Sequence, residues 1–123
     1  GQDAGQPISK ETAQTLSEML ANSLEWGESE ALVSGYRLAG KTGTAQIPTE
    51  YGWYASDETN ASFIGWGPVD DPQFMVYVWL EKPSASIWAS QTASPVFAEV
   101  VLETVRLLNI PPDSVRQQYA GGQ

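Results

Sequence analysis

The residues whose types and spacing could do chemistry lie in one short run, residues 35–46, with the sequence Gly-Tyr-Arg-Leu-Ala-Gly-Lys-Thr-Gly-Thr-Ala-Gln. Lys41 carries a positive charge, and the hydroxyls of Thr42 and Thr44 can both donate and accept hydrogen bonds. If the run is extended, the two threonines share one face and could bind a carboxylate together, while Lys41 starts from the opposite face. Two kinds of site use these residue types: a loop that binds phosphate and a cleft for acyl transfer.

The first interpretation rests on residues 35–42, which match the phosphate-binding pattern G-x-x-x-x-G-K-T. Such a loop must open a helix, because the N–H groups of the first helical turn hold the phosphates. Residues 43–48 contain Gly and end in Pro, so they do not begin a helix. The loop interior would also hold the bulky Tyr36, Arg37 and Leu38. We therefore interpret this match as coincidental.

The second interpretation takes Lys41-Thr42-Gly43 as the K-T-G element of serine enzymes that act on D-Ala-D-Ala peptides or β-lactams. A strand beside such a cleft can pair its backbone with an extended peptide. Gly43 removes a side chain where that peptide must come close. Gln46 lies outward on the same face as the threonines and is a weaker candidate for a cleft contact. The following loop holds aromatic residues that could border the cleft or cover the sheet: Tyr51, Trp53 and Tyr54.

The composition argues against several other classes of function. The 123 residues carry six Lys and Arg against fifteen Asp and Glu, a net charge of -9, and such an acidic surface repels nucleic acid and anionic membranes. The absence of Cys and His removes the usual zinc sites, disulfides, thiol catalysis and a Ser-His-Asp triad. We expect no cofactor, no metal and no nucleic-acid partner.

Hydrophobic spacing and turn residues predict an α+β fold in which helices cover an antiparallel sheet. The two strands of the predicted hairpin are apolar on both faces, so we expect them to lie centrally with cover on each side. Trp66, Trp79 and Trp88 are expected in the core. The expected elements are a helix from about Lys10 to Glu25 with Ser9 as N-cap, strands over residues 36–46, 61–66 and 74–80, and a helix that starts at Ser94-Pro95 and ends at residues 109–112.

An ordered series of segments resembles the C-terminal part of the transpeptidase domain of class B penicillin-binding proteins. The resemblance covers about residues 7–113, with residues 1–6 as a scar or linker and residues 114–123 as a disordered tail. It implies part of the penicillin-binding/β-lactamase-like transpeptidase fold. The segments that carry it are residues 8–13 (Ile-Ser-Lys-Glu-Thr-Ala), 35–46, 61–66 (Ala-Ser-Phe-Ile-Gly-Trp), 94–97 (Ser-Pro-Val-Phe) and 109–113 (Asn-Ile-Pro-Pro-Asp).

The same resemblance implies a serine D,D-transpeptidase that cross-links peptidoglycan stem peptides and is acylated by penicillins. Lys41 would assist proton relay and carboxylate recognition, and Thr42 and Thr44 would bind the substrate carboxylate beside Gly43 and Gln46. The Thr44 backbone N–H would form half of the oxyanion hole. The implied partners are D-Ala-D-Ala stem peptides and β-lactams. The implied location is the extracytoplasmic face of the bacterial inner membrane, through an anchor outside this chain.

The chain departs from that family in lacking two of its motifs. No Lys follows a Ser by three positions and no Asn follows a Ser by two, so S-x-x-K and S-x-N are both absent. We therefore expect an inactive fragment that lacks the nucleophile helix. We also expect its open sheet edge to pair with the remainder of the domain or with a second chain. Residues 87–90, Ile-Trp-Ala-Ser, stand where Gly-rich sequence is common in the family. The alternatives are a non-catalytic module of the same fold that binds a peptide or a partner, and a β-lactamase.

Overall fold

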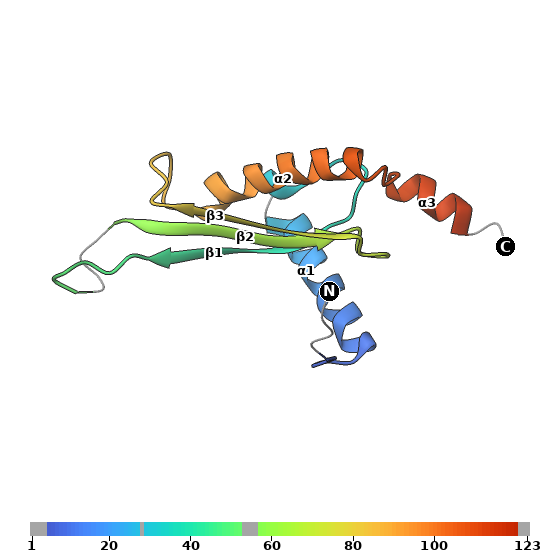
Figure 1. The fold of residues 1–123 in the computed structure, drawn as a ribbon, viewed down its shortest axis with the longest axis horizontal. Helices are drawn as coiled ribbons and strands as arrows, with labels where there is room; N and C mark the ends of the chain where they lie inside the picture. The colour runs from blue at the N-terminus through green and yellow to red at the C-terminus, as the bar shows by residue number, and fades with distance from the viewer. Residues whose placement is uncertain (1–4, 28, 53–56, 121–123) are drawn as a thin grey trace.

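The strands form a sheet in the order β1-β2-β3, and both neighbouring pairs are antiparallel, as the sequence predicts. The structure is a computed structural model that describes residues 5–27, 29–52 and 57–120 (Figure 1). None of the helices in these residues has the length and apolar character that a membrane crossing requires. The elements are α1 (Lys10–Gly27), a short 3-10 helix η1 (Ser29–Ala31), β1 (Ala39–Gln46), β2 (Thr59–Gly67), β3 (Phe74–Glu81), α2 (Ala89–Leu107) and α3 (Asp113–Ala120).

Helix α2 covers one face of the sheet and runs along it (Figure 1). Every second residue of β2 is buried on this side, as expected for a strand with one covered face. At the centre, the rings of Phe63 and Phe97 meet with their centroids 4.4 Å apart. This contact joins the central strand to the helix. The smaller buried residues around it are Ala61, Val78, Ala93, Val101 and Val105.

Two glycines allow the helix and the strands to pack this closely. A Cβ on Gly65 would lie 2.5 Å from the Phe97 ring and 2.9 Å from the Ala39 carbonyl oxygen. A Cβ on Gly40, the residue before Lys41, would lie 2.6 Å from the Phe63 ring. Because these neighbours are core rings and backbone, they have no free space into which to move. The two positions therefore require glycine for packing reasons.

Helix α1 packs against β1 with its C-terminal part, and its N-terminal part projects away from the sheet (Figure 1). The indole Nε1 of Trp66 donates a hydrogen bond to Ser17 Oγ at 3.1 Å and fixes this crossing. Ser9 caps the helix as predicted, since its Oγ accepts the backbone N–H three residues further on. The helix extends to Gly27, close to its predicted end at Glu25.

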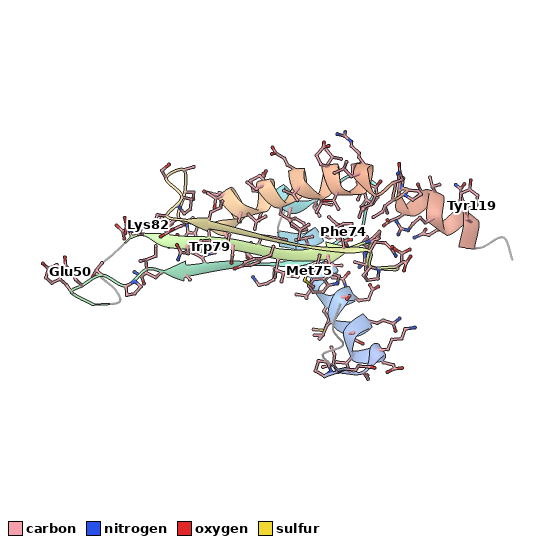
Figure 2. All side chains as sticks on the ribbon, in the orientation of Figure 1. Glu50, Phe74, Met75, Trp79, Lys82 and Tyr119 are labelled. Atoms are coloured by element: carbon pink, nitrogen blue, oxygen red, sulfur yellow. The ribbon has the colours of Figure 1, made fainter. Side chains whose placement is uncertain are left out.

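The second face of the hairpin lies largely bare in the part of the chain that the structure describes. We expected cover on both faces, which is wrong here: Tyr77 is 62% exposed and Met75 is 66% exposed. Figure 2 labels Met75 and Trp79, which the strand register places on the face away from α2. The physical reason is that, among the described residues, α2 covers one face, while α1 packs against β1 and meets the other face near Trp66. Trp79 and Trp88, which we expected in the core, are both more than half exposed.

Helix α2 begins at Ala89, several residues before the predicted start at Ser94-Pro95. Pro95 lies inside the helix, where it cannot donate a backbone hydrogen bond. Burial of the preceding turn outweighs this loss, because Ala93 and Ser94 are fully buried against the sheet. The Thr92 hydroxyl also donates to the Trp88 carbonyl at 2.9 Å and supports the first turn. The end of the helix before residues 109–112 agrees with the prediction.

The segment after residue 112 forms helix α3, where we expected a disordered tail from residue 114. Asp113 lies in the first turn, where its negative charge is favourable, and Arg116 pairs with it one turn later at 3.0 Å. Arg116 also pairs with Asp70 in the β2–β3 turn. This long-range ion pair was not visible in the local sequence. Residues 1–4 of the predicted scar or linker lie outside the described residues, as do residues 121–123.

We predict that Gly65→Ala lowers the free energy of unfolding by about 1–3 kcal/mol, because the added methyl overlaps the Phe97 ring and a backbone oxygen. Gly27→Ala is the matched control, since a Cβ at Gly27 has no neighbour within 4 Å. Urea unfolding of a polypeptide containing this chain measures both changes. Equal midpoints for the two variants would contradict the packing argument.

Candidate functional site

The threonines of the K-T-G run lie on the face of β1 that α2 covers. In the register of the sheet, Thr42 pairs with Phe63 and Thr44 pairs with Ala61, and both partners are buried beneath α2. Gln46 follows on the same face at the end of the strand. The side-chain alternation predicted from the sequence therefore holds for all three residues. Neither Thr44 nor Gln46 is buried.

Lys41 starts from the opposite face, in register with Ile64, and yet its ammonium meets the first threonine. Its Nζ donates to the Thr42 hydroxyl at 3.0 Å and to the Thr42 carbonyl at 3.2 Å. In the described residues β1 lies at the edge of the sheet, so the outer side of its backbone is open to a side chain that starts from the opposite face. The lysine stem therefore wraps around the outer edge of β1 and brings the positive charge beside the hydroxyl. Sequence alternation alone gave no sign of this contact.

The outer edge of β1 presents backbone groups as well as this charge. Because the Thr42 carbonyl accepts from Lys41, it points away from β2, and Thr42 with Phe63 forms a pair without ladder hydrogen bonds. Such pairs alternate along an antiparallel ladder, so the Thr44 backbone N–H points toward the same outer edge. In the described residues β1 pairs with β2 alone. The edge therefore places a cation, a hydroxyl and an outward N–H within a few residues of one another.

The hydroxyl of Thr44 lies at the N-terminal end of α2. Its Oγ1 accepts a hydrogen bond from the Ala89 backbone N–H at 3.3 Å, and Ala89 is the first residue of the helix. A helix N-terminus carries a partial positive charge that favours an anion nearby. A cavity of about 200 Å³ opens beside this contact. Its lining residues are Thr44, Gln46, Asp57, Thr59, Ile87 and Trp88.

Gly43 has a structural role that the sequence interpretation did not include. A Cβ at this position would lie 2.6 Å from Ser62 Oγ on the neighbouring strand. The Ser62 hydroxyl instead donates to the Gly43 carbonyl at 3.4 Å. Gly43 therefore makes room for Ser62 on the bare face of the sheet, and this contact does not depend on any ligand.

The cavity includes four residues that sequence reasoning missed: Asp57, Thr59, Ile87 and Trp88. The sequence predicts Trp88 in the core because tryptophan is often buried, whereas it is 57% exposed in the loop before α2. The departure of residues 87–90 from the Gly-rich pattern was the one signal that could have indicated it. Of the aromatic loop residues, Tyr51 is 88% exposed, and Trp53 and Tyr54 lie outside the described residues.

The arrangement can bind an anion and an extended strand, but its sequence has no nucleophile motif of the S-x-x-K kind. Within the described residues, no group of His, Cys, Asp and Glu side chains is arranged to hold a metal ion. The chemistry available on β1 is therefore hydrogen bonding and positive charge at a strand edge.

Comparison with known proteins identifies the family. A family described as "Penicillin binding protein transpeptidase domain" matches residues 1–102. The chain is 35% identical over 118 residues to Stage V sporulation protein D of Bacillus subtilis, covering 93% of this chain and 18% of that protein. It is 34% identical over 85 residues to the peptidoglycan D,D-transpeptidase FtsI homolog of Mesostigma viride, covering 68% of this chain and 14% of that protein. The chain thus spans less than a fifth of these relatives.

Solved structures show the same fold. The transpeptidase domain of penicillin-binding protein 3 from Burkholderia pseudomallei superposes with a TM-score of 0.77 at 31% identity, covering 92% of this chain and 37% of that chain. Penicillin-binding protein 3 from Mycobacterium tuberculosis, solved in complex with ampicillin, gives a TM-score of 0.73 at 29% identity, covering 85% of this chain and 26% of that chain. Sequence and structure together show that the chain belongs to the penicillin-binding protein transpeptidase family and forms part of its fold.

Proposed function

We propose that this chain supplies the K-T-G strand of a serine D,D-transpeptidase that cross-links peptidoglycan stem peptides. The observation that carries the proposal is the outer edge of β1, where the Lys41 ammonium contacts Thr42 and the Thr44 N–H points outward. The nucleophilic serine and its activating lysine belong to a part of the protein outside this chain, because neither S-x-x-K nor S-x-N occurs here. The chain by itself is therefore inactive in this proposal.

The substrate would lie along β1 as an added strand. Its terminal carboxylate would bind the hydroxyls of Thr42 and Thr44 beside the ammonium of Lys41, with the N-terminus of α2 adding partial positive charge nearby. The scissile carbonyl would then place its oxygen at the Thr44 N–H, one of the two donors that stabilise the tetrahedral intermediate. Gln46 would contact the substrate further along the same strand.

Penicillins would bind covalently at the same cleft, through the serine outside this chain. The support is the Mycobacterium tuberculosis relative, which was solved in complex with ampicillin. A β-lactam carries a carboxylate next to a reactive acyl group, so it meets the same hydroxyls and the same outward N–H as a D-Ala-D-Ala terminus. Because peptidoglycan lies outside the cytoplasmic membrane, we place the protein on the extracytoplasmic face of the bacterial inner membrane.

The remainder of the transpeptidase domain is the proposed partner of the surfaces left bare. The chain covers 37% of the Burkholderia pseudomallei domain, which leaves most of such a domain to pack against it. Tyr77 and Trp79 are more than half exposed on the bare sheet face, and an apolar groove of about 590 Å³ continues this face toward α1. The β3 edge, which has no strand beside it in the described residues, would pair with a strand from that remainder.

The first experiment measures the intact mass of the full-length protein after incubation with a penicillin. We expect a stable adduct of one penicillin, formed more slowly in Lys41→Ala because the ammonium no longer stands beside Thr42. Lys10→Ala is the matched control, since Lys10 is an exposed lysine at the start of α1, away from β1. No adduct on the folded protein would favour the alternative, a non-catalytic module that binds a peptide or a partner.

A second experiment tests the carboxylate role of Thr44. Thr44→Val keeps the shape of the side chain and removes the hydroxyl, so we expect acylation by penicillin to slow roughly 10- to 100-fold, the loss of a hydrogen bond to a charged group. Thr44→Ser, which keeps the hydroxyl, should stay close to the wild-type rate. A penicillin methyl ester has no carboxylate, so Thr44→Val and wild type should then react alike. A deficit of the same size with the ester would show that Thr44 acts through the fold, for example through Ala89.

A further inference from the structure

The segment that leads into β1 is held by the C-terminal part of the chain over three consecutive residues. The Asp113 backbone N–H donates to the Gly35 carbonyl at 2.9 Å, and the Tyr36 hydroxyl donates to the Ile110 carbonyl at 2.8 Å. The Arg37 backbone N–H donates to Asp113 Oδ2 at 2.7 Å. These contacts join positions more than 70 residues apart in the sequence. The chain entering β1 is therefore fixed by backbone-directed hydrogen bonds from one small region.

Arg37 also connects this segment to the other elements at the same end of the sheet. Its carbonyl accepts from the Val69 N–H of the β2–β3 turn at 2.9 Å. Its guanidinium pairs with Glu18 at 2.5 Å and with Glu25 at 3.0 Å, both on α1, and donates to Asn22 at 2.7 Å. The hydrogen bond that the Arg37 guanidinium donates to Glu18 is the largest cause of the raised pKa of Arg37. Helix α1, helix α3 and the hairpin turn therefore meet at this residue.

The carboxylate of Asp113 is itself oriented by an ion pair with Arg116. Arg116 lies 3.0 Å from Asp113 Oδ1 in an ion pair that lacks hydrogen-bond geometry, and it also pairs with Asp70 of the hairpin turn. The side chains of Arg116 and Asp113 are 15% and 20% exposed, so water screens this pair less than a surface pair. Arg116 Nη1 donates in addition to the Pro111 carbonyl at 3.0 Å. Helix α3 thus presents a carboxylate with one oxygen aimed at the Arg37 N–H.

We propose that Asp113 is a positioning residue for the K-T-G strand: its carboxylate, oriented by Arg116, fixes the backbone of Arg37 and through it the placement of Lys41. The segment between Arg37 and Lys41 is short and rigid. Leu38 and Ala39 are buried with exposures of 2% and 0%, and Gly40 has no room for a side chain, so a shift at residue 37 is passed to residue 41. The catalytic part of this inference rests on the proposed function, and the placement of the strand does not.

The test uses the full-length protein with two readouts, the rate of acylation by penicillin and amide hydrogen exchange over residues 39–46. In Asp113→Ala we expect faster exchange in this strand and acylation slowed about 10- to 100-fold, as for a displaced catalytic group. Asp113→Asn keeps an acceptor for the Arg37 N–H and loses the charge that faces Arg116, so we expect partial rescue of both readouts. Val101→Ala is the stability control, because Val101 lies on the face of α2 that is fully buried in the hydrophobic core.

Each outcome decides one question. Faster exchange with slower acylation per folded molecule, absent in Val101→Ala, supports the positioning role. The same exchange change in a protein that penicillin does not acylate supports the placement of β1 by Asp113 and overturns the proposed function instead. Unchanged exchange over residues 39–46 in Asp113→Ala overturns the inference, as does an equal loss of acylation in Val101→Ala, because both would reduce Asp113 to a general contribution to stability.

Discussion

The contact between Phe63 and Phe97 is the constraint on which the rest of the structure depends. It sets the distance between α2 and the sheet, and it is possible only because Gly40 and Gly65 carry no side chain there. Phe63 lies opposite Thr42 in the register, so the same contact sets the height of the K-T-G run relative to the helix. The N-terminus of α2 then reaches the Thr44 hydroxyl at 3.3 Å. A packing requirement in the core thereby fixes the geometry of a polar edge.

The two faces of the sheet differ in how far other parts of the chain cover them. One face is closed by α2, whereas the other leaves Tyr77 and Trp79 more than half exposed over a chain that spans 37% of a related transpeptidase domain. Exposed aromatic side chains gathered on one face are typical of a surface that contacts another element or molecule. The apolar pattern of both hairpin strands thus describes the surroundings expected in a larger domain, and the cover predicted on each side was wrong for these residues alone.

Sequence reasoning succeeded where local rules decide the structure. The start of α1 at Lys10, the hairpin and the shared face of Thr42 and Thr44 follow from capping, turn residues and alternation. Sequence reasoning failed where contacts between residues far apart in the sequence decide the structure. The early start of α2 depends on burial against the sheet, which outweighs Pro95.

Contacts that the local sequence pattern does not show account for the other differences between the predictions and the structure. Helix α3 depends on Arg116 pairing with Asp70 in a turn 46 residues away. The meeting of Lys41 with Thr42 depends on the reach of a flexible side chain around a strand edge, which a two-residue period cannot represent. Because β1 is held near its beginning through Arg37 and Asp113, and near its end through Thr44 and the first turn of α2, it is fixed along the covered side. Its outer edge is then the side that remains available, and a strand that is rigid on one side and open on the other can accept an extended ligand with little loss of order of its own.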